Sequence, residues 1–244
     1  MDIPDLDALP GFRRRFVVTP GPDAVVSAVE DDYHCMAVRL RHDGVSVVEV
    51  EALMDRAPWT TCPGAMAVLK QTFVGATLAE AAALGRKTDN CTHLYDLAVL
   101  AAAHAGDTAP LTYDIVVCDP VDALVAAEIR REGRTVLRLE HREHVMVSPA
   151  EIAGVSLFKL REWIGGLGEV EREAARLLQW GTILANGRTY PMELQSDATR
   201  MPPNCFTFQP HNSKSARRVG KVINLSQEQR APLAYFDAVE FAYG

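Results

Sequence analysis

The segment that decides the fold is Tyr33–Leu53, with the sequence YHCMAVRLRHDGVSVVEVEAL. At its centre, Asp43-Gly44 separates two runs in which apolar and polar residues alternate, a pattern typical of a β-hairpin with a tight turn. Successive side chains of a strand point to opposite faces, so the apolar residues of the first run share one face; they are Met36, Val38 and Leu40. The segment predicts two antiparallel strands, Tyr33–Arg41 and Val45–Leu53.

The flanking sequence adds strands on both sides of this hairpin and helices between them. Further strands are expected at 12–18, 23–29, 111–118, 121–131 and 134–147, although 121–131 is alanine-rich and fits a helix equally well. Three helices are expected from 63 to 73, from the capping box at Thr77–Glu80 to about 84, and from 91 to 104. The sequence thus predicts an α+β fold in which an antiparallel sheet carries helices on one face.

The C-terminal part has helical patterns followed by few regular periods. Helical residues are expected from Ser148 to Trp163 and again from Glu169 to Ala185, and a C-terminal helical arm follows. We therefore expect a core domain over 1–147 that carries the functional site, and helices and an extended arm over 148–244 that pack on the core or on a partner subunit. The apolar residues of the arm favour a homo-oligomer.

The composition is that of an ordinary globular protein with an acidic balance. The 244 residues contain 25 Lys and Arg against 32 Asp and Glu, a formal charge of −7, which disfavours non-specific nucleic-acid binding. No apolar run approaches the ~18 residues of a membrane span, and the acidic start lacks the order of a signal peptide, so we expect a cytoplasmic protein. Five cysteines are too few for a disulfide framework, and free thiols are expected.

Residues whose side chains can take part in catalysis or ligand binding concentrate between positions 33 and 95. They are Tyr33, His34, Trp59, Cys62, Cys91, His93 and Tyr95. Cys62 and Cys91 both fall at expected helix starts, where unpaired backbone N–H groups favour a thiolate and lower the pKa of the thiol. The alternative is that two small, buried cysteines simply fill crowded helix starts. Both interpretations stay open from the sequence.

Part of this region resembles the NifU/IscU-type iron–sulfur scaffold proteins, a SufE/NifU-like fold. The resemblance lies within residues 33–106 and rests on Cys62–Ala65, Gly75–Ala81 and Cys91–Leu94. It implies the scaffold fold and, as an alternative function, a zinc or iron–sulfur site formed by His34, Cys62, Cys91 and His93. The sequence departs from the scaffold pattern, because Asn90 stands where those proteins have a histidine. Cys91 and His93 can share a metal only if Cys91 lies outside the helix.

Nearly the whole chain also resembles an uncharacterised bacterial family, known as a domain of unknown function. The resemblance rests on His34 and Met36, on Cys62, on the C-T-H-L motif of Cys91–Leu94, and on the C-F-T-F-Q-P motif of Cys205–Pro210. It implies that the C-terminal motif closes over a site.

These observations favour a cofactor-independent enzyme that acts on a small, aromatic and anionic molecule, in aromatic-compound catabolism. The reaction expected is that of a C–C lyase that releases a small aldehyde such as formaldehyde. His34 or His93 would be the base, and Tyr33 or Tyr95 would donate to developing charge. Arg86 or Lys87 would hold a carboxylate, and Trp59 would stack on the substrate.

Two other classes of function remain beside the enzyme. The chain is either a metal or iron–sulfur binding protein, or an interaction protein that keeps only the fold. His141 and His144 lie three apart in an expected strand, so they are predicted to face opposite sides at the surface.

Overall fold

The computed structural model describes residues 5–85, 87–238 and 241, and the chain divides into two compact units. The larger unit comprises Phe16–Leu111, Met192–Ile223 and Leu233–Gly244, and the smaller unit comprises Met1–Arg15, Thr112–Pro191 and Asn224–Pro232. Each unit is therefore built from segments that are distant in the sequence. Position 147, where the sequence suggested a domain boundary, lies inside a strand of the smaller unit.

The larger unit contains the hairpin that the sequence analysis started from. Its strands are the second half of β1 (Gly11–Pro20), β2 (Ala24–Asp31), β3 (Cys35–His42) and β4 (Val47–Arg56), in the order β4-β3-β2-β1. The pairs β2–β3 and β3–β4 are antiparallel. Within the hairpin, Leu40 pairs with Val50, and Met36, Val38 and Leu40 are all buried, as predicted.

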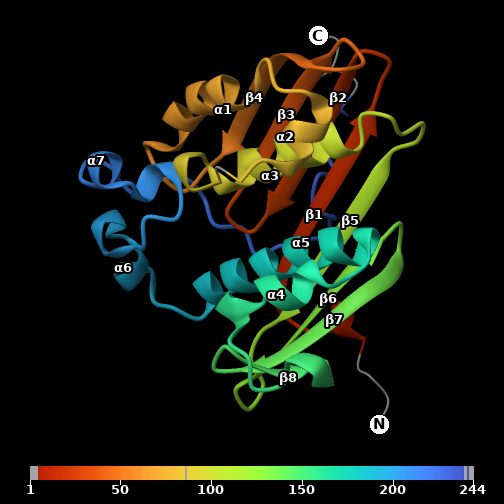
Figure 1. Cartoon of the computed structure of the whole chain (residues 1–244). Helices are drawn as coiled ribbons and strands as arrows, with labels where there is room; N and C mark the ends of the chain where they lie inside the picture. Colours follow the sequence, from red (N-terminus) through yellow and green to blue (C-terminus); the bar gives the residue numbers. More distant parts are fainter. Residues whose placement is uncertain (1–4, 86, 239–240, 242–244) are drawn as a thin grey trace. The chain divides into compact units, whose positions relative to one another are not determined.

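Helices of the larger unit lie on one side of these strands (Figure 1). They are α1 (Ala65–Phe73), α2 (Leu78–Ala83) and α3 (Thr92–Ala103), close to the predicted bounds. The capping box is present, because the Thr77 hydroxyl accepts from the backbone of Glu80 and the Glu80 carboxylate accepts from the backbone of Thr77. Helix α3 packs on β2 and β3 and is buried from Thr92 to Ala102.

Most of the C-terminal arm belongs to the larger unit, and Asn224–Pro232 belongs to the smaller one. Its regular elements are short: α6 (Met192–Gln195), α7 (Pro210–Ser213) and the 3₁₀ turns Ala198–Arg200 and Phe206–Phe208. Further along, Leu233 and Phe236 pack against Ala28 and Ala37. Ala37 neighbours Met36 in β3, so it points to the opposite face of the strand. Apolar side chains of the arm therefore cover the face of the sheet opposite to the one on which Met36 lies.

The smaller unit is an antiparallel sheet covered by one long helix. Its strands are the first half of β1, β5 (Leu111–Cys118), β6 (Leu124–Arg131), β7 (Arg134–Arg142) and β8 (Val145–Ser148), in the order β1-β5-β6-β7-β8. Helix α5 (Glu169–Ala185) spans the predicted residues and packs on β6 and β7. A Cβ at Gly181 would lie 3.1 Å from a methyl carbon of Ile115, so this glycine permits the close approach of helix and sheet.

Two predictions for the smaller unit were wrong. The run 134–147 is a hairpin and not one strand, because Glu143 and His144 turn the chain with positive φ angles of 48° and 67°. The run 148–163 is not a continuous helix: it holds the 3₁₀ turns Ala150–Ile152 and Leu157–Lys159, followed by α4 (Arg161–Gly165). Gly154, with φ of 84°, sits between the two turns in a conformation that ends helical structure.

The predicted fold class is confirmed as α+β with an antiparallel sheet and several helices. The scaffold-like core implied by the NifU/IscU resemblance is not confirmed. Among the described residues, no helix combines the length and the apolar character needed to cross a membrane.

Candidate functional site

A buried carboxylate and two histidines form the centre of the candidate site, all in the larger unit. Asp31 ends β2, and its Oδ1 accepts hydrogen bonds from the backbone N–H groups of Tyr33 and His34 at 2.8 and 2.9 Å. The same oxygen lies 2.9 Å from Nδ1 of the His34 ring. Asp31 is fully buried and His34 is 5% exposed. The turn between β2 and β3 therefore holds the imidazole against the carboxylate.

This contact fixes which nitrogen of His34 carries its proton. A carboxylate that already accepts two backbone N–H groups serves as an acceptor, so Nδ1 of His34 is the donor. Nε2 is then the nitrogen with a lone pair, which can accept a proton or bind a metal. An Asp that orients a histidine in this way is a recurrent arrangement in acid–base centres.

The second histidine stacks on the first. His93, near the N-terminus of α3, lies with its ring centroid 3.7 Å from that of His34, at an interplanar angle of 28°. Its Nδ1 is 3.9 Å from Sγ of Cys91. Cys91 has extended backbone angles and precedes the helix as its N-cap. Sequence reasoning required this non-helical conformation for Cys91 and His93 to share a ligand, and the structure meets the requirement.

The cysteines around this centre are protonated thiols. Burial raises the pKa of Cys91 to about 12, and the neighbouring Cys62 adds to the effect. Burial likewise raises the pKa of Cys62 and brings that of Cys205 to about 11. Of the two interpretations that the sequence left open, a thiolate favoured by the helix starts does not fit these raised pKa values, because desolvation outweighs the helix terminus. The alternative interpretation, small residues filling buried helix starts, fits the structure.

The C-terminal motif Cys205–Pro210 contacts this region. The hydroxyl of Thr207 lies 3.5 Å from Sγ of Cys62 and 3.1 Å from the hydroxyl of Thr61. The backbone N–H of Phe206 donates to the carbonyl of Asn90 at 2.9 Å. The motif thus bridges the residues that precede α1 and α3.

An arginine and aromatic rings form the neighbouring part of the site. The Arg218 guanidinium lies 5.4 Å from the ring centroid of Trp59, and the Phe208 ring meets Trp59 edge-on at 5.7 Å. Burial lowers the pKa of Arg218, partly offset by Tyr33 and Cys62. A guanidinium remains charged under all ordinary conditions, so Arg218 brings positive charge close to Tyr33 and Cys62.

The structure places the other predicted site residues differently. The Lys87 ammonium is paired with both carboxylate oxygens of Asp96, at 2.8 and 2.6 Å. The Tyr95 hydroxyl donates to the carbonyl of Leu84. The Tyr33 ring contacts His34 edge-on, with centroids 6.2 Å apart. Arg86 lies outside the described residues.

The positions of these side chains can also be compared with the requirements of a metal site. Among the described residues, the group of His, Cys, Asp and Glu whose ligand atoms all lie within 4.8 Å of one another is Asp31, His34 and His93. It shares two members with the set expected from sequence, and neither Cys62 nor Cys91 belongs to it. Stacked imidazoles direct their in-plane lone pairs along roughly parallel lines, whereas two ligands of one ion must direct theirs to a single point.

Sequence reasoning missed two residues of the site. Asp31 had a local signal, because an Asp whose side chain accepts from the backbone two and three residues ahead makes an Asx turn, and Asp31 lies three residues before His34. Arg218 had only the short basic run Arg217-Arg218. Its place beside Trp59 depends on the path of the C-terminal arm.

Comparison with known proteins relates part of the chain to a protein family. No curated protein matches the chain, and the resemblance to iron–sulfur scaffold proteins is not supported. Residues 19–106, about a third of the chain, match the family described as a protein of unknown function (DUF2889). The matched segment lies inside the larger unit and contains Asp31, His34 and His93.

Proposed function

We propose that the larger unit is a cofactor-independent acid–base enzyme, a C–C lyase that releases formaldehyde from a small aromatic anion. The observation that carries the proposal is the hydrogen bond of 2.9 Å between the buried Asp31 carboxylate and Nδ1 of His34, which leaves Nε2 of His34 as a base. The protonated thiols support proton transfer over nucleophilic chemistry, because the thiolate is the reactive form of cysteine.

In the proposed reaction, R–CH₂OH gives R–H and formaldehyde. Nε2 of His34 takes the hydroxyl proton, the C–C bond breaks, and its electron pair passes into a carbonyl group of R as an enolate. Formaldehyde leaves, and His34 returns the same proton to the enolate carbon, so no proton or electron is gained or lost. The Asp31 carboxylate and the face of the stacked His93 ring stabilise the imidazolium that exists between these two steps.

The positive charge of Arg218 supports an anionic substrate. A guanidinium binds a carboxylate through two parallel hydrogen bonds. Trp59, 3% exposed, lies against Arg218 and places an aromatic ring beside that charge. In the proposal Arg218 takes the role that sequence reasoning gave to Arg86 or Lys87.

The test is formaldehyde release from 4-(3-hydroxypropanoyl)benzoate, which carries a ring, a carboxylate, a ketone and a terminal hydroxymethyl group. The expected products are 4-acetylbenzoate and formaldehyde. His34→Gln should lower turnover by roughly 10²–10⁴, the usual contribution of a general base, with an unchanged circular dichroism spectrum. His211→Gln, at an exposed histidine, is the matched control. A wild-type protein that releases no formaldehyde would overturn the lyase assignment.

A zinc site is the second candidate, favoured by the proximity of Asp31, His34 and His93. It would need the two rings to rotate out of their stack before both nitrogens could face one ion. Metal analysis of protein purified without an affinity tag separates the candidates. Stoichiometric zinc or iron that is lost in His34→Gln would replace the proton-transfer proposal, and protein with neither metal nor turnover would favour the interaction protein.

A further inference from the structure

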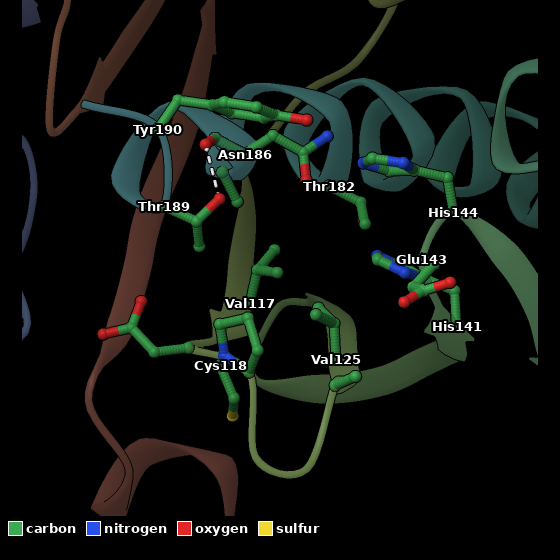
Figure 2. Close-up of a pocket in the computed structure, with 14 residues that line it drawn as sticks. Val117, Cys118, Val125, His141, Glu143, His144, Thr182, Asn186, Thr189 and Tyr190 are labelled. Atoms are coloured by element: carbon green, nitrogen blue, oxygen red, sulfur yellow. Dashed lines mark hydrogen bonds between the residues drawn. The ribbon is translucent and has the colours of Figure 1, made fainter. Parts of the chain in front are cut away.

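The smaller unit contains a cavity of about 210 Å³ that is unrelated to the Asp31–His34–His93 cluster. It lies between strands β5 to β7 and the C-terminal end of α5 (Figure 2). The surface that its wall presents is mostly apolar, and Val117, Val125 and Ala185 contribute to it. A cavity of roughly 150 Å³ is enough to hold benzene, so this one accommodates a single substituted ring.

One buried histidine points into this cavity. His141 is 3% exposed, stands opposite Val125 in the pairing of β6 with β7, and turns its ring toward the cavity (Figure 2). Neither of its ring nitrogens has a hydrogen-bond partner among the described residues. Buried polar groups in folded proteins are nearly always hydrogen-bonded, and an exception calls for an explanation.

The groups around His141 determine which ligand atoms can form hydrogen bonds with its ring nitrogens. Burial and the nearby His144 lower the pKa of His141 to about 4, so at neutral pH the ring is uncharged, with one donor and one acceptor nitrogen. The His144 ring stacks on it with centroids 5.7 Å apart. The Asp119 carboxylate, also in the lining, is already bound by Arg188 at 2.7 and 3.0 Å.

The charges around the cavity favour a neutral occupant. With Asp119 compensated and His141 neutral, the remaining charge of the lining is the carboxylate of Glu143, an exposed residue, which disfavours an anion. A hydroxyl group can both donate to and accept from an imidazole. A phenol combines that group with a ring of the right size.

We propose that this cavity is a second ligand site, which binds a neutral phenol with its hydroxyl group on the His141 ring. The site lies wholly within the smaller unit, and it does not depend on the function proposed for the larger one. Asn186, at the end of α5, projects toward the cavity (Figure 2) and supplies a further polar group beside the ring.

The experiment is a set of two-dimensional NMR titrations of the full ¹⁵N-labelled chain with three probes at neutral pH. The probe p-cresol should shift resonances of Val125, His141 and Asn186. Toluene, which lacks the hydroxyl, should bind roughly fivefold to tenfold more weakly, as expected for one lost hydrogen bond. The anion 4-hydroxybenzoate should bind more weakly than p-cresol. Equal binding of p-cresol and toluene, or no shift with p-cresol, would overturn the proposal.

Two variants keep the proposal open to refutation. His141→Phe should remove the preference for p-cresol over toluene, and Val125→Phe should fill the cavity and abolish binding of both. His104→Phe, at a histidine of the larger unit that pairs with Asp107, is the control and should titrate like the wild type. If His141→Phe fails to fold, Val125→Phe alone decides, and p-cresol binding that survives it would place the ligand elsewhere and contradict the assignment.

Discussion

Each unit of this protein contains a buried histidine stacked on a second histidine, and the two pairs differ in what holds the buried ring. In the larger unit, His34 is bound to the Asp31 carboxylate at 2.9 Å and stacks on His93 at 3.7 Å. In the smaller unit, His141 stacks on His144 at 5.7 Å, and no described residue hydrogen-bonds its nitrogens. The first ring is oriented by its own chain, whereas the second faces an open cavity.

Burial alone does not assign a role to a histidine. A carboxylate partner fixes the tautomer and stabilises the imidazolium, and both are needed in a general base. An unpartnered ring is a destabilising feature unless something else satisfies it. We therefore propose proton transfer for the first pair and ligand binding for the second.

The largest effect is expected for the thiol beside the first pair. With a pKa of about 12, Cys91 has a thiolate fraction of about 10⁻⁴ at pH 8, about a thousandfold below that of an ordinary cysteine. Iodoacetamide at pH 8 should therefore leave Cys91 unmodified in the native protein and modify it rapidly in urea, as measured by peptide mass spectrometry. Rapid modification of Cys91 in the native protein would contradict the raised pKa and make this thiol a candidate for the chemistry of the site.

Phenylalanine substitutions at the two buried histidines should shift stability in opposite directions. His34→Phe takes a donor from the fully buried Asp31 carboxylate and should lower the free energy of unfolding by about 2–3 kcal/mol. His141→Phe removes an unsatisfied polar ring and should leave stability unchanged or raise it by up to about 1 kcal/mol. Urea denaturation at pH 7 measures both, and losses of equal size would erase the distinction between the pairs.

Acid should also destabilise the protein through His141. Its pKa is about 4 in the folded state against an ordinary value of 6.5, so between these values the unfolded chain binds more protons and stability falls as the pH falls. The contribution is about 2–3 kcal/mol, lost between pH 6.5 and 4. In denaturation measured from pH 7.5 to 4, His141→Phe should flatten this slope relative to the wild type. An unchanged slope would show that His141 titrates normally.

A smaller effect than that of His34→Phe is expected for Asp31→Asn, because the amide oxygen can still accept from the backbone N–H groups of Tyr33 and His34. We expect a loss of about 1–2 kcal/mol, from replacing hydrogen bonds to a charge with neutral ones. Asp114→Asn, at a half-exposed carboxylate paired with Arg15, is the comparison and should lose less than about 1 kcal/mol. If Asp31→Asn loses no more stability than Asp114→Asn, the buried carboxylate of Asp31 does not hold the turn and His34 as proposed.

Local patterns predicted the elements of the fold better than their assembly. Asp43-Gly44 located the first hairpin, and the periodicity of Glu169–Ala185 gave α5 with its observed ends. The turn at Glu143 and His144 escaped prediction because it contains no glycine, although both residues have positive φ. That missed turn also hid the burial of His141, which sequence reasoning placed at the surface.

The region of the candidate site could be predicted from the sequence, but the set of residues that come together there could not. His34 and His93 were identified, and the structure stacks their rings. Asp31 was missed because its role depends on a side chain that folds back onto its own turn. Arg218 is 125 residues from His93 in the sequence, and pairwise spacing carries no information about contacts that a long arm creates.

The most direct test of the central claim, that Asp31 holds His34 as a base, is the tautomer of His34. A two-bond ¹H–¹⁵N correlation spectrum of ¹⁵N-histidine-labelled protein at neutral pH distinguishes a protonated ring nitrogen from an unprotonated one. We predict that His34 is protonated at Nδ1 and unprotonated at Nε2, and that Asp31→Asn, whose amide oxygen is a weaker acceptor, reduces this preference. A His34 ring protonated at Nε2 alone, or one that averages both tautomers in the wild type, would contradict it.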